Sequence, residues 1–388
     1  MSNFPSVSST QKWVLNDSRI DKFVNENPSE NLTKNNFFFL TRIIYIYVIP
    51  FSRVIFYYLK QFIVSGNKNK KKITSLILHS GRGYDNNNIQ KIFQINTNEM
   101  YLIYAFSLTD YMKYEKLSIF ILLRNLAKAI ADYKSVLTMK FPDEIIGILY
   151  ENTGNISVFT YLISFFQQFK EKHPGCTVYS SGAILPSHAA ILSEYRAINI
   201  YHGVMGKINV STFPEYDSVC VYSNDERNYL IDAGIKSKVL TYPMTKAESH
   251  KNIAIFFMPS IAINKIDWSV FSESFLSLTK LFKTFDYDLY IKVHPLVKAS
   301  EKFSKEYNLQ PYNWDEIFNL SNFINVDGSD AGSIINKLKP NFIISWGSTA
   351  LCEALNMGLI PITLWDTCWD GSESVYQINK RALLWPSE

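Results

Sequence analysis

Short apolar runs alternate with longer stretches of helical periodicity along most of this chain, beginning at Ile73. The runs end in polar or glycine-containing turns, which is typical of buried strands. The first set of predicted elements comprises strands at 73–78, 101–106, 145–150, 177–179 and 197–201 and helices at 117–139 and 156–172. Strands separated by helices in this way indicate a mostly parallel, doubly wound sheet.

A second set of the same kind follows a proline and a polar run near 243–251. Its predicted strands lie at 253–258, 289–293, 342–344 and 361–364, and its helices at 270–285 and 330–337. The pattern predicts an α/β protein with two Rossmann-like, doubly wound domains, over 73–245 and 246–388. The length of 388 residues agrees, because one hydrophobic core rarely supports so long a chain.

The chain before Ile73 has a different character. Residues 1–36 are polar and predicted to be poorly ordered. Residues 37–64 are mostly aromatic and aliphatic, but Pro50 and the cations Arg42, Arg53 and Lys60 interrupt them, so no simple transmembrane helix is predicted. Those cations fall within about 20° of one helix face, and a lysine-rich run follows. The pattern predicts an amphipathic helical segment over 37–72 at the inner-membrane surface; the alternative is a hairpin packed on the body.

Composition narrows the class of protein. A formal net charge of +4 is too small to indicate nucleic acid as the main partner. The four cysteines contain no C-x-x-C pair, which argues against a zinc site or a disulfide framework. The first 30 residues do not read as a signal peptide, so we expect a cytoplasmic protein held peripherally at the inner membrane.

The most informative stretch runs from Asn341 to Leu364 and reads as strand, polar turn, helix, glycine stop and strand. Its turn carries Ser345, Gly347, Ser348 and Thr349 where the helix presents unpaired N–H groups, which favours binding of a phosphate. Glu353, one turn further, is positioned to accept from a ribose hydroxyl. The alternative is that Ser348 or Thr349 only caps the helix.

A second polar turn follows the predicted strand at 289–293 and contains Lys292, His294 and Pro295. Ligands of open α/β sheets bind at the carboxyl ends of the strands, so we expect both turns to face one crevice. A cation and an imidazole beside a helix N-terminus would stabilise a departing phosphate. The alternative is a histidine that merely ends a strand.

The N-terminal half offers candidates for an acceptor base. His202 and Gly203 follow a predicted strand, and an imidazole there can remove a proton from a hydroxyl. Glu151 follows the strand predicted at 145–150 and is the second base candidate, unless it caps the next helix. Gly81 and Arg82 follow the first strand and are assigned to the acceptor side.

Two motifs argue against metal and dinucleotide cofactors. Asp286 and Asp288 have the spacing of a diphosphate–metal site, but they precede a strand and should lie at the wrong end of the sheet. The glycine turn at 81–83 lacks the third glycine of a dinucleotide fingerprint. We therefore expect neither a metal nor NAD.

Taken in order, several short motifs resemble those of bacterial surface-polysaccharide glycosyltransferases of the GT-B type: Glu151-Asn152, His202-Gly203, Pro214 to Ser223, Leu230 to Gly234, Lys292 to Pro295 and Ser348 to Glu353. That group includes capsule sialyl- and polysialyltransferases, Kdo transferases and teichoic-acid glycerophosphotransferases. The resemblance covers roughly residues 145 to 365 and implies two Rossmann-like domains facing a cleft. It also implies that His294, Pro295, Ser348 and Thr349 contact a nucleotide, typically CMP, and that His202 is catalytic. The acidic motif of the sialyltransferases has no close copy here.

The sequence thus predicts a metal-independent glycosyltransferase that moves a sugar from a nucleotide donor, with CMP the expected nucleotide, to a surface polysaccharide or lipid-linked glycan. His294, with Lys292 and the 345–349 turn, would stabilise the leaving nucleotide, while Glu151 or His202 acts as base. The alternatives are a CDP-alcohol phosphotransferase, a nucleotide-sugar epimerase and a non-catalytic scaffold of a polysaccharide assembly complex.

Overall fold

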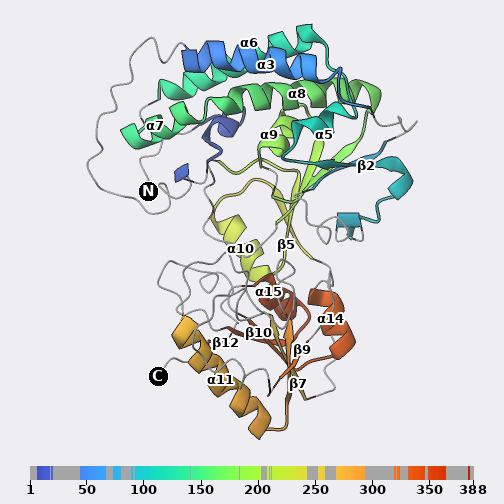
Figure 1. The fold of residues 1–388 in the computed structure, drawn as a ribbon, viewed down its shortest axis with the longest axis vertical. Coiled ribbons are helices and arrows are strands. Elements are labelled where there is room, and N and C mark those ends of the chain that lie inside the picture. Colours follow the sequence, from blue (N-terminus) through green and yellow to red (C-terminus); the bar gives the residue numbers. More distant parts are fainter. Residues whose placement is uncertain are drawn as a thin grey trace. The chain divides into compact units, whose positions relative to one another are not determined.

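The computed structural model of the chain (Figure 1) describes residues 7–17, 19–20, 44–66, 73–79, 89–90, 92–139, 141–182, 184–201, 208, 210, 212–242, 252–257, 268–292, 319, 321–323, 331–345, 348–363 and 383–384. The chain folds into two compact units. The first comprises 1–201, 207–220 and 230–239, and the second comprises 202–206, 221–229 and 240–388. The predicted domain boundary at 245 falls outside the described residues.

The first sheet has six strands in the order β2-β1-β3-β4-β5-β6. The strands are β1 (Ser75–His79), β2 (Met100–Tyr104), β3 (Thr177–Ser180), β4 (Arg196–Ile200), β5 (Ser218–Val221) and β6 (Lys238–Thr241). The registered pairs from β2 through β5 are all parallel. Leu76, Ile77 and Leu78 of β1 are fully buried, as expected for a parallel strand covered on both faces. The doubly wound α/β prediction is therefore confirmed for this sheet.

The chain between these strands forms helices. They are α5 (Leu108–Met112), α6 (Ile119–Leu137), α7 (Asp143–Glu151), α8 (Gly154–Lys172), α9 (Ile184–Leu192) and α10 (Asn224–Asp232), and the short turn η3 (Thr97–Glu99) precedes β2. Buried residues occur all round α8, which packs against α5, α6 and α9. The helix α6 covers α8 from outside (Figure 1).

The strand predicted at 145–150 is wrong, because these residues belong to α7. Ile145, Ile148 and Leu149 are buried at helical spacing, while Glu144 and Glu151 are exposed. A short apolar run cannot by itself distinguish a buried strand from a helix. The acidic residues of the first turn favour the helix through its dipole.

Poor order is also the wrong expectation for residues 7–17. The 3₁₀ turn η1 (Lys12–Leu15) places Trp13 in the main core, where its indole stacks on Phe159 with ring centroids 4.1 Å apart. Trp13, Val14 and Leu15 are essentially inaccessible to solvent. A single buried apolar cluster is enough to order a segment whose average composition is polar.

The apolar segment before Ile73 forms a π-helical turn, η2 (Ile44–Val48), and α3 (Ile49–Lys60). Pro50 lies in the first turn of α3, where proline is tolerated, so it starts this helix instead of kinking it. The helix packs on α8 and α6, and its residue Val54 is fully buried. The ring of Tyr57 packs edge-on against the ring of Tyr161 in α8, with the ring centroids 6.0 Å apart. No helix among the described residues is long and apolar enough to span a membrane.

The C-terminal end of α3 is pinned to the body by a buried amide. Gln61 is fully buried; its side chain donates to the carbonyl oxygen of Leu117 at 3.0 Å and accepts from the Leu117 N–H at 2.7 Å. Lys116 donates to the carbonyl oxygens of Gln61 and Val64. The helix α3 is therefore packed against the rest of the first unit on one face, and its other face stays exposed to solvent.

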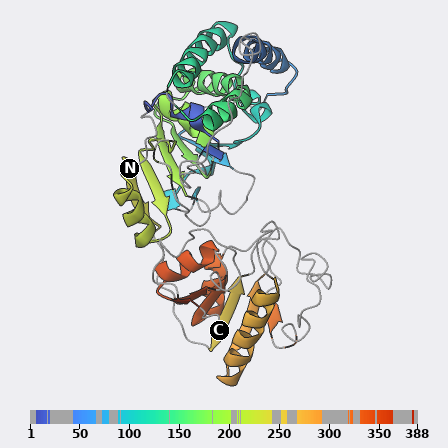
Figure 2. The same cartoon turned by 90° about the vertical axis from the view of Figure 1, so that its left-hand side faces the viewer.

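The second sheet has the order β12-β11-β10-β7-β8-β9 and is also parallel. Its strands are β7 (Ile253–Phe257), β8 (Asp288–Lys292), β9 (Asn322–Phe323), β10 (Phe342–Ser345), β11 (Ile360–Thr363) and β12 (Leu383–Leu384). The helices are α11 (Trp268–Thr284), α14 (Ala331–Leu338) and α15 (Thr349–Asn356). In Figure 2, α11 lies on one side of the sheet and α14 and α15 on the other. The second doubly wound set is therefore confirmed.

Candidate functional site

The turn from β10 into α15 has the predicted local structure. Ser348 is extended, and its Oγ accepts a hydrogen bond from the N–H of Ala350 at 3.2 Å, so it is the N-cap of α15. Gly358 follows the C-cap residue Met357 and has a φ of +78°, which an L side chain rarely adopts. The N–H of Leu359 then donates to the Ala354 carbonyl at 2.9 Å, which completes a Schellman motif.

This turn lies where the order of the second sheet reverses. The chain moves from β7 to β8 and β9 on one side, and then returns to place β10 against the opposite edge of β7. The carboxyl ends of β7 and β10 therefore flank a topological switch point, which is where open α/β sheets bind ligands. The N-terminus of α15 stands at that point, with N–H groups that favour an anion.

Strand register brings two of the predicted residues into one row. Phe257, the last residue of β7, pairs with Lys292 on one side and with Ser345 on the other. Lys292 and Ser345 are thus two strands apart, or about 10 Å between Cα atoms. Lys292 and Ser345 therefore both lie at the carboxyl edge of the second sheet.

The side chains differ in how they are used. The Oγ of Ser345 is fully buried and donates to the carbonyl oxygen of Phe257 at 2.7 Å, so it holds two strands together. Lys292 is 7% exposed and Glu353 is 9% exposed. A largely buried ammonium at the end of a strand is well placed to hold an anion, because little water competes for it. His294, Pro295, Gly347 and the side chain of Thr349 lie outside the described residues.

Asp286 and Asp288 lie at the other end of β8. Asp286 has a φ of +60° in the turn before the strand, and Asp288 is its first residue. The whole strand separates them from Lys292. Among the described residues, no group of three or more histidine, cysteine or acidic side chains is arranged to hold a metal ion.

In the first unit, Glu151 is the last residue of α7 and its side chain is 63% exposed. Its Oε2 accepts from the guanidinium of Arg19 at 2.5 Å, and Arg19 also bonds Asp17 at 3.0 Å. Burial would raise the pKa of Asp17, but hydrogen bonds from Arg19 and Asn152 lower it below its usual value. Glu151 is therefore one member of an ion-pair network that joins α7 to the N-terminal segment.

His79 was missed by the sequence reasoning. It ends β1 at the carboxyl edge of the first sheet, and its ring lies 5.5 Å from that of Tyr104, which ends β2. Burial lowers the pKa of His79, and the Asp110 carboxylate partly offsets this, so the imidazole is mostly neutral at pH 7. The rule that selected Lys292, a polar residue at the end of a buried strand, would have found it. Gly81, Arg82, His202 and Gly203 lie outside the described residues.

Comparisons with known proteins give distant structural likenesses. No protein-family model matches the chain, and no curated protein matches it significantly. The solved structures similar to it include UDP-GlcNAc 2-epimerase from Neisseria meningitidis, with 14% identity, coverage of 76% of this chain and 83% of that chain, and a TM-score of 0.40. The UDP-GlcNAc 2-epimerase from Methanocaldococcus jannaschii has 11% identity, coverage of 80% of this chain and 88% of that chain, and a TM-score of 0.42. MurG from Acinetobacter baumannii has 11% identity, coverage of 80% of this chain and 85% of that chain, and a TM-score of 0.39. These TM-scores are below 0.5, so we draw the fold from the sheet topology and no activity from the likeness.

Proposed function

We propose that the chain is a GT-B-type glycosyltransferase that takes a sugar from a nucleotide donor, with CMP the expected nucleotide, and adds it to a bacterial surface polysaccharide or lipid-linked glycan. The observation that carries the proposal is the edge of the second sheet, where the N-terminus of α15 stands at the switch point and Lys292 lies in the same register row as Ser345. That arrangement suits the phosphates of a nucleotide. The resemblance of the His294 and Ser348 motifs to those of cytidine-nucleotide enzymes supports the choice of CMP.

The transfer chemistry follows from charge. Negative charge develops on the departing phosphate as the bond to the sugar breaks, and Lys292, His294 and the α15 N–H groups would stabilise it. The acceptor hydroxyl needs a base. We assign that role to His202 before Glu151, because the Glu151 carboxylate already pairs with Arg19 at 2.5 Å.

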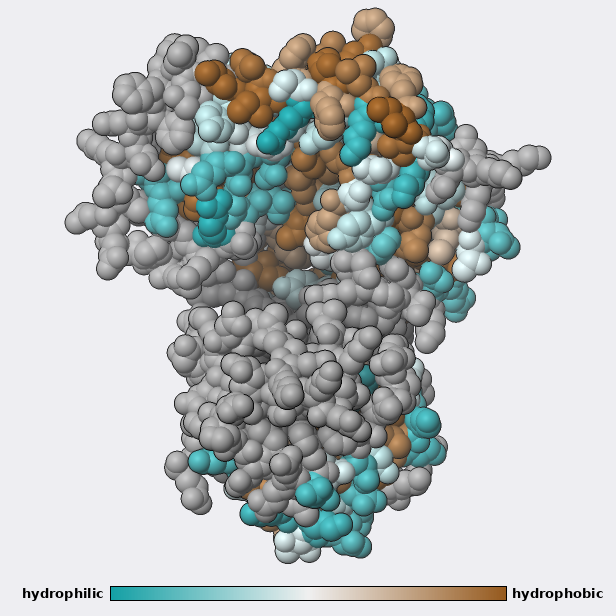
Figure 3. Space-filling model, viewed as in Figure 1, coloured by the Kyte–Doolittle hydropathy of each residue, from teal (hydrophilic) through white to brown (hydrophobic). Residues whose placement is uncertain are grey.

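The second part of the proposal is that the chain binds a membrane surface, since many apolar side chains stay exposed on the outer helices. We call this the α3–α6 face, and Figure 3 shows it as apolar surface gathered over those helices. Its members are Ile44, Tyr45, Tyr47, Val48, Phe51, Phe56, Leu59, Phe62, Ile63, Phe120 and Leu123. The helix α3 contains Arg53 and Lys60 and no acidic residue, which suits anionic headgroups. An enzyme with a lipid-linked acceptor would work at such a surface.

Nucleotide binding tests the central claim directly. We expect calorimetric titration with CMP, CDP, UDP and GDP to give tightest binding for a cytidine nucleotide. Lys292→Ala should weaken that binding about tenfold or more, because it removes a partly desolvated charge contact of about 1.5–3 kcal/mol. The matched control is Lys283→Ala, an exposed lysine near the end of α11, at the amino edge of the sheet. Equal losses in the two variants, or no nucleotide binding by the native chain, would refute the proposal.

Products distinguish the remaining alternatives. Incubation with the donor and an acceptor glycan should yield a glycosidic bond. A phosphodiester would indicate the CDP-alcohol transferase, and an isomerised donor would indicate the epimerase. Nucleotide binding without any product would indicate the non-catalytic scaffold. The solved structures named above include both epimerases and a MurG protein, so they do not choose among these outcomes.

A further inference from the structure

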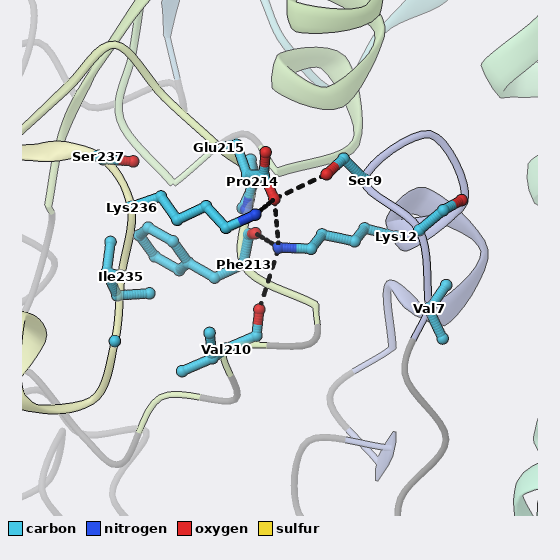
Figure 4. Close-up of a pocket in the computed structure, with 12 residues that line it drawn as sticks. Val7, Ser9, Lys12, Val210, Phe213, Pro214, Glu215, Ile235, Lys236 and Ser237 are labelled. Carbon is cyan, nitrogen blue, oxygen red and sulfur yellow. Dashed lines mark hydrogen bonds and ion pairs between the residues drawn. The ribbon is translucent and has the colours of Figure 1, made fainter.

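A cavity of about 380 Å³ opens beside the first sheet (Figure 4). Its walls come from the N-terminal segment at 7–12, from the chain leading into β5, and from residues 234–237 leading into β6. All of these residues belong to the first unit. The cavity therefore lies at the amino ends of β5 and β6, whereas ligands of the sheet itself are expected at the carboxyl ends. Its volume is in the range of small-molecule sites.

A fixed carboxylate stands in this cavity. The Oε1 atom of Glu215 accepts from Ser9 Oγ at 2.7 Å and pairs with the ammonium groups of Lys12 at 3.2 Å and Lys236 at 3.5 Å. Burial would raise the pKa of Glu215, but hydrogen bonds from Ser9 and Lys12 and the charges of both lysines lower it. Glu215 is thus ionised at neutral pH. Its other oxygen, Oε2, has no partner among the described residues and can accept from a ligand hydroxyl.

The two lysines play different parts. Lys12 is committed to the protein, because its Nζ also donates to the carbonyl oxygens of Val210 and Phe213, each at 3.2 Å. The Lys236 side chain is 77% exposed, and its one contact within the described chain is the long pair with Glu215. Lys236 therefore keeps donors for an anionic group on a ligand.

Apolar surface lies beside these polar groups. Phe213 and Ile235 line the cavity together with Glu215 and Lys236. The cavity therefore offers a ring face, an anionic hydrogen-bond acceptor and a cation to one ligand.

From these features we propose that the cavity is a second saccharide site, which takes one sugar unit that bears a carboxylate. Lys236 pairs with the carboxylate, Glu215 Oε2 accepts from a ring hydroxyl, and Phe213 packs against the non-polar face of the ring. A bare anion would leave Glu215 repelling it, and an apolar ligand would leave the charges unpaired. A hydroxylated acid uses the Lys236 ammonium, the second oxygen of Glu215 and the ring of Phe213.

The position of the cavity suggests what such a site is for. β5 has four residues, so the Cα atoms at its two ends are about 10 Å apart. A growing acidic glycan whose end lies at the carboxyl edge would present an earlier sugar at the cavity. This role as a second contact for the acceptor rests on the proposed transferase function, but the binding of the acidic sugar does not.

Binding is tested without donor nucleotide and without turnover. We expect saturation-transfer NMR to show millimolar binding of D-glucuronate, with D-glucose at least fivefold weaker and inorganic phosphate not competing. Lys236→Ala should raise the dissociation constant for glucuronate roughly fivefold, since it removes a solvent-exposed ion pair of about 1 kcal/mol. The matched control is Lys238→Ala, an exposed lysine two residues away that does not line the cavity.

Phe213→Ala provides a second and independent measurement. This variant should weaken the binding of glucuronate and of glucose alike, because it removes the ring that packs against the non-polar face of the sugar. Unchanged binding of both sugars would overturn the assignment of Phe213. Absence of glucuronate binding, equal binding of phosphate, or equal effects of the two lysine variants would overturn the site. None of these results bears on nucleotide binding, so the two proposals fail separately.

Discussion

The α3–α6 face leads to a quantitative prediction about lipid binding. Phe56, Phe62 and Phe120 are 58%, 64% and 81% exposed, so together they present about as much surface as two fully exposed phenylalanines. Burying one such ring contributes about 1.5–3 kcal/mol. Replacing all three by serine should therefore cost at least about 3 kcal/mol of membrane partitioning, or roughly 100-fold in affinity.

The assay is co-sedimentation with vesicles of phosphatidylglycerol and phosphatidylethanolamine, followed over a range of lipid concentrations. Substituting phosphatidylcholine for the anionic lipid should weaken binding of the native protein by about tenfold or more, because Arg53 and Lys60 each contribute about 1 kcal/mol at an anionic surface. High salt should have the same effect.

Phe285 offers a matched control for the loss of an exposed ring. It is 65% exposed and lies just after α11 in the second unit, so Phe285→Ser removes a comparable ring that is not part of the α3–α6 face. That variant should bind vesicles as the native protein does. If the triple variant binds vesicles with an affinity within threefold of the native protein, the assignment of the α3–α6 face is refuted. The single variant Phe120→Ser provides the direct comparison for Phe285→Ser, and an equal loss of vesicle affinity in these two variants would also refute the assignment. Unchanged thermal midpoints would establish that neither result reflects unfolding.

Three further outcomes are expected. Trp13→Ala should lower the free energy of unfolding by about 3–5 kcal/mol in urea denaturation, because Trp13 is fully buried, whereas Trp13→Phe should cost clearly less. Burial lowers the pKa of His188 to about 4 from a usual 6.5, so the unfolded chain takes up the proton at a higher pH than the folded chain does. The stability that comes from the neutral imidazole should be fully present above pH 6.5 and should fall by up to about 3 kcal/mol as the pH is lowered toward 4. His188→Gln should flatten that dependence of stability on pH. Replacing His202 by Gln should lower turnover at least about 100-fold without loss of nucleotide binding, because the acceptor hydroxyl loses its base. Glu151→Gln should keep turnover within about threefold of the native value. The reverse result in steady-state kinetics would make Glu151 the base.

The sequence determined those features in which local pattern and burial agree. Continuous apolar runs predicted both parallel sheets, because strands buried on two faces need no alternation. The Gly358 stop and the Ser348 cap were both readable, since each meets a backbone requirement within a few residues. The capping box of α10 was equally local, although it was overlooked: the Ser223 N–H donates to Glu226 Oε2 at 3.1 Å, and the Glu226 N–H donates to Ser223 Oγ at the same distance.

Only the tertiary structure decided the remainder. The run at 145–150 is apolar enough for a strand, and its packing in the core made it a helix. Trp13 orders a polar terminus because a pocket beside Phe159, far along the chain, accepts its ring. The partner of Glu151 is Arg19, more than a hundred residues away, and the Glu215 cavity joins three separate segments. Such contacts join residues with no common local pattern, so composition and periodicity carry no signal for them.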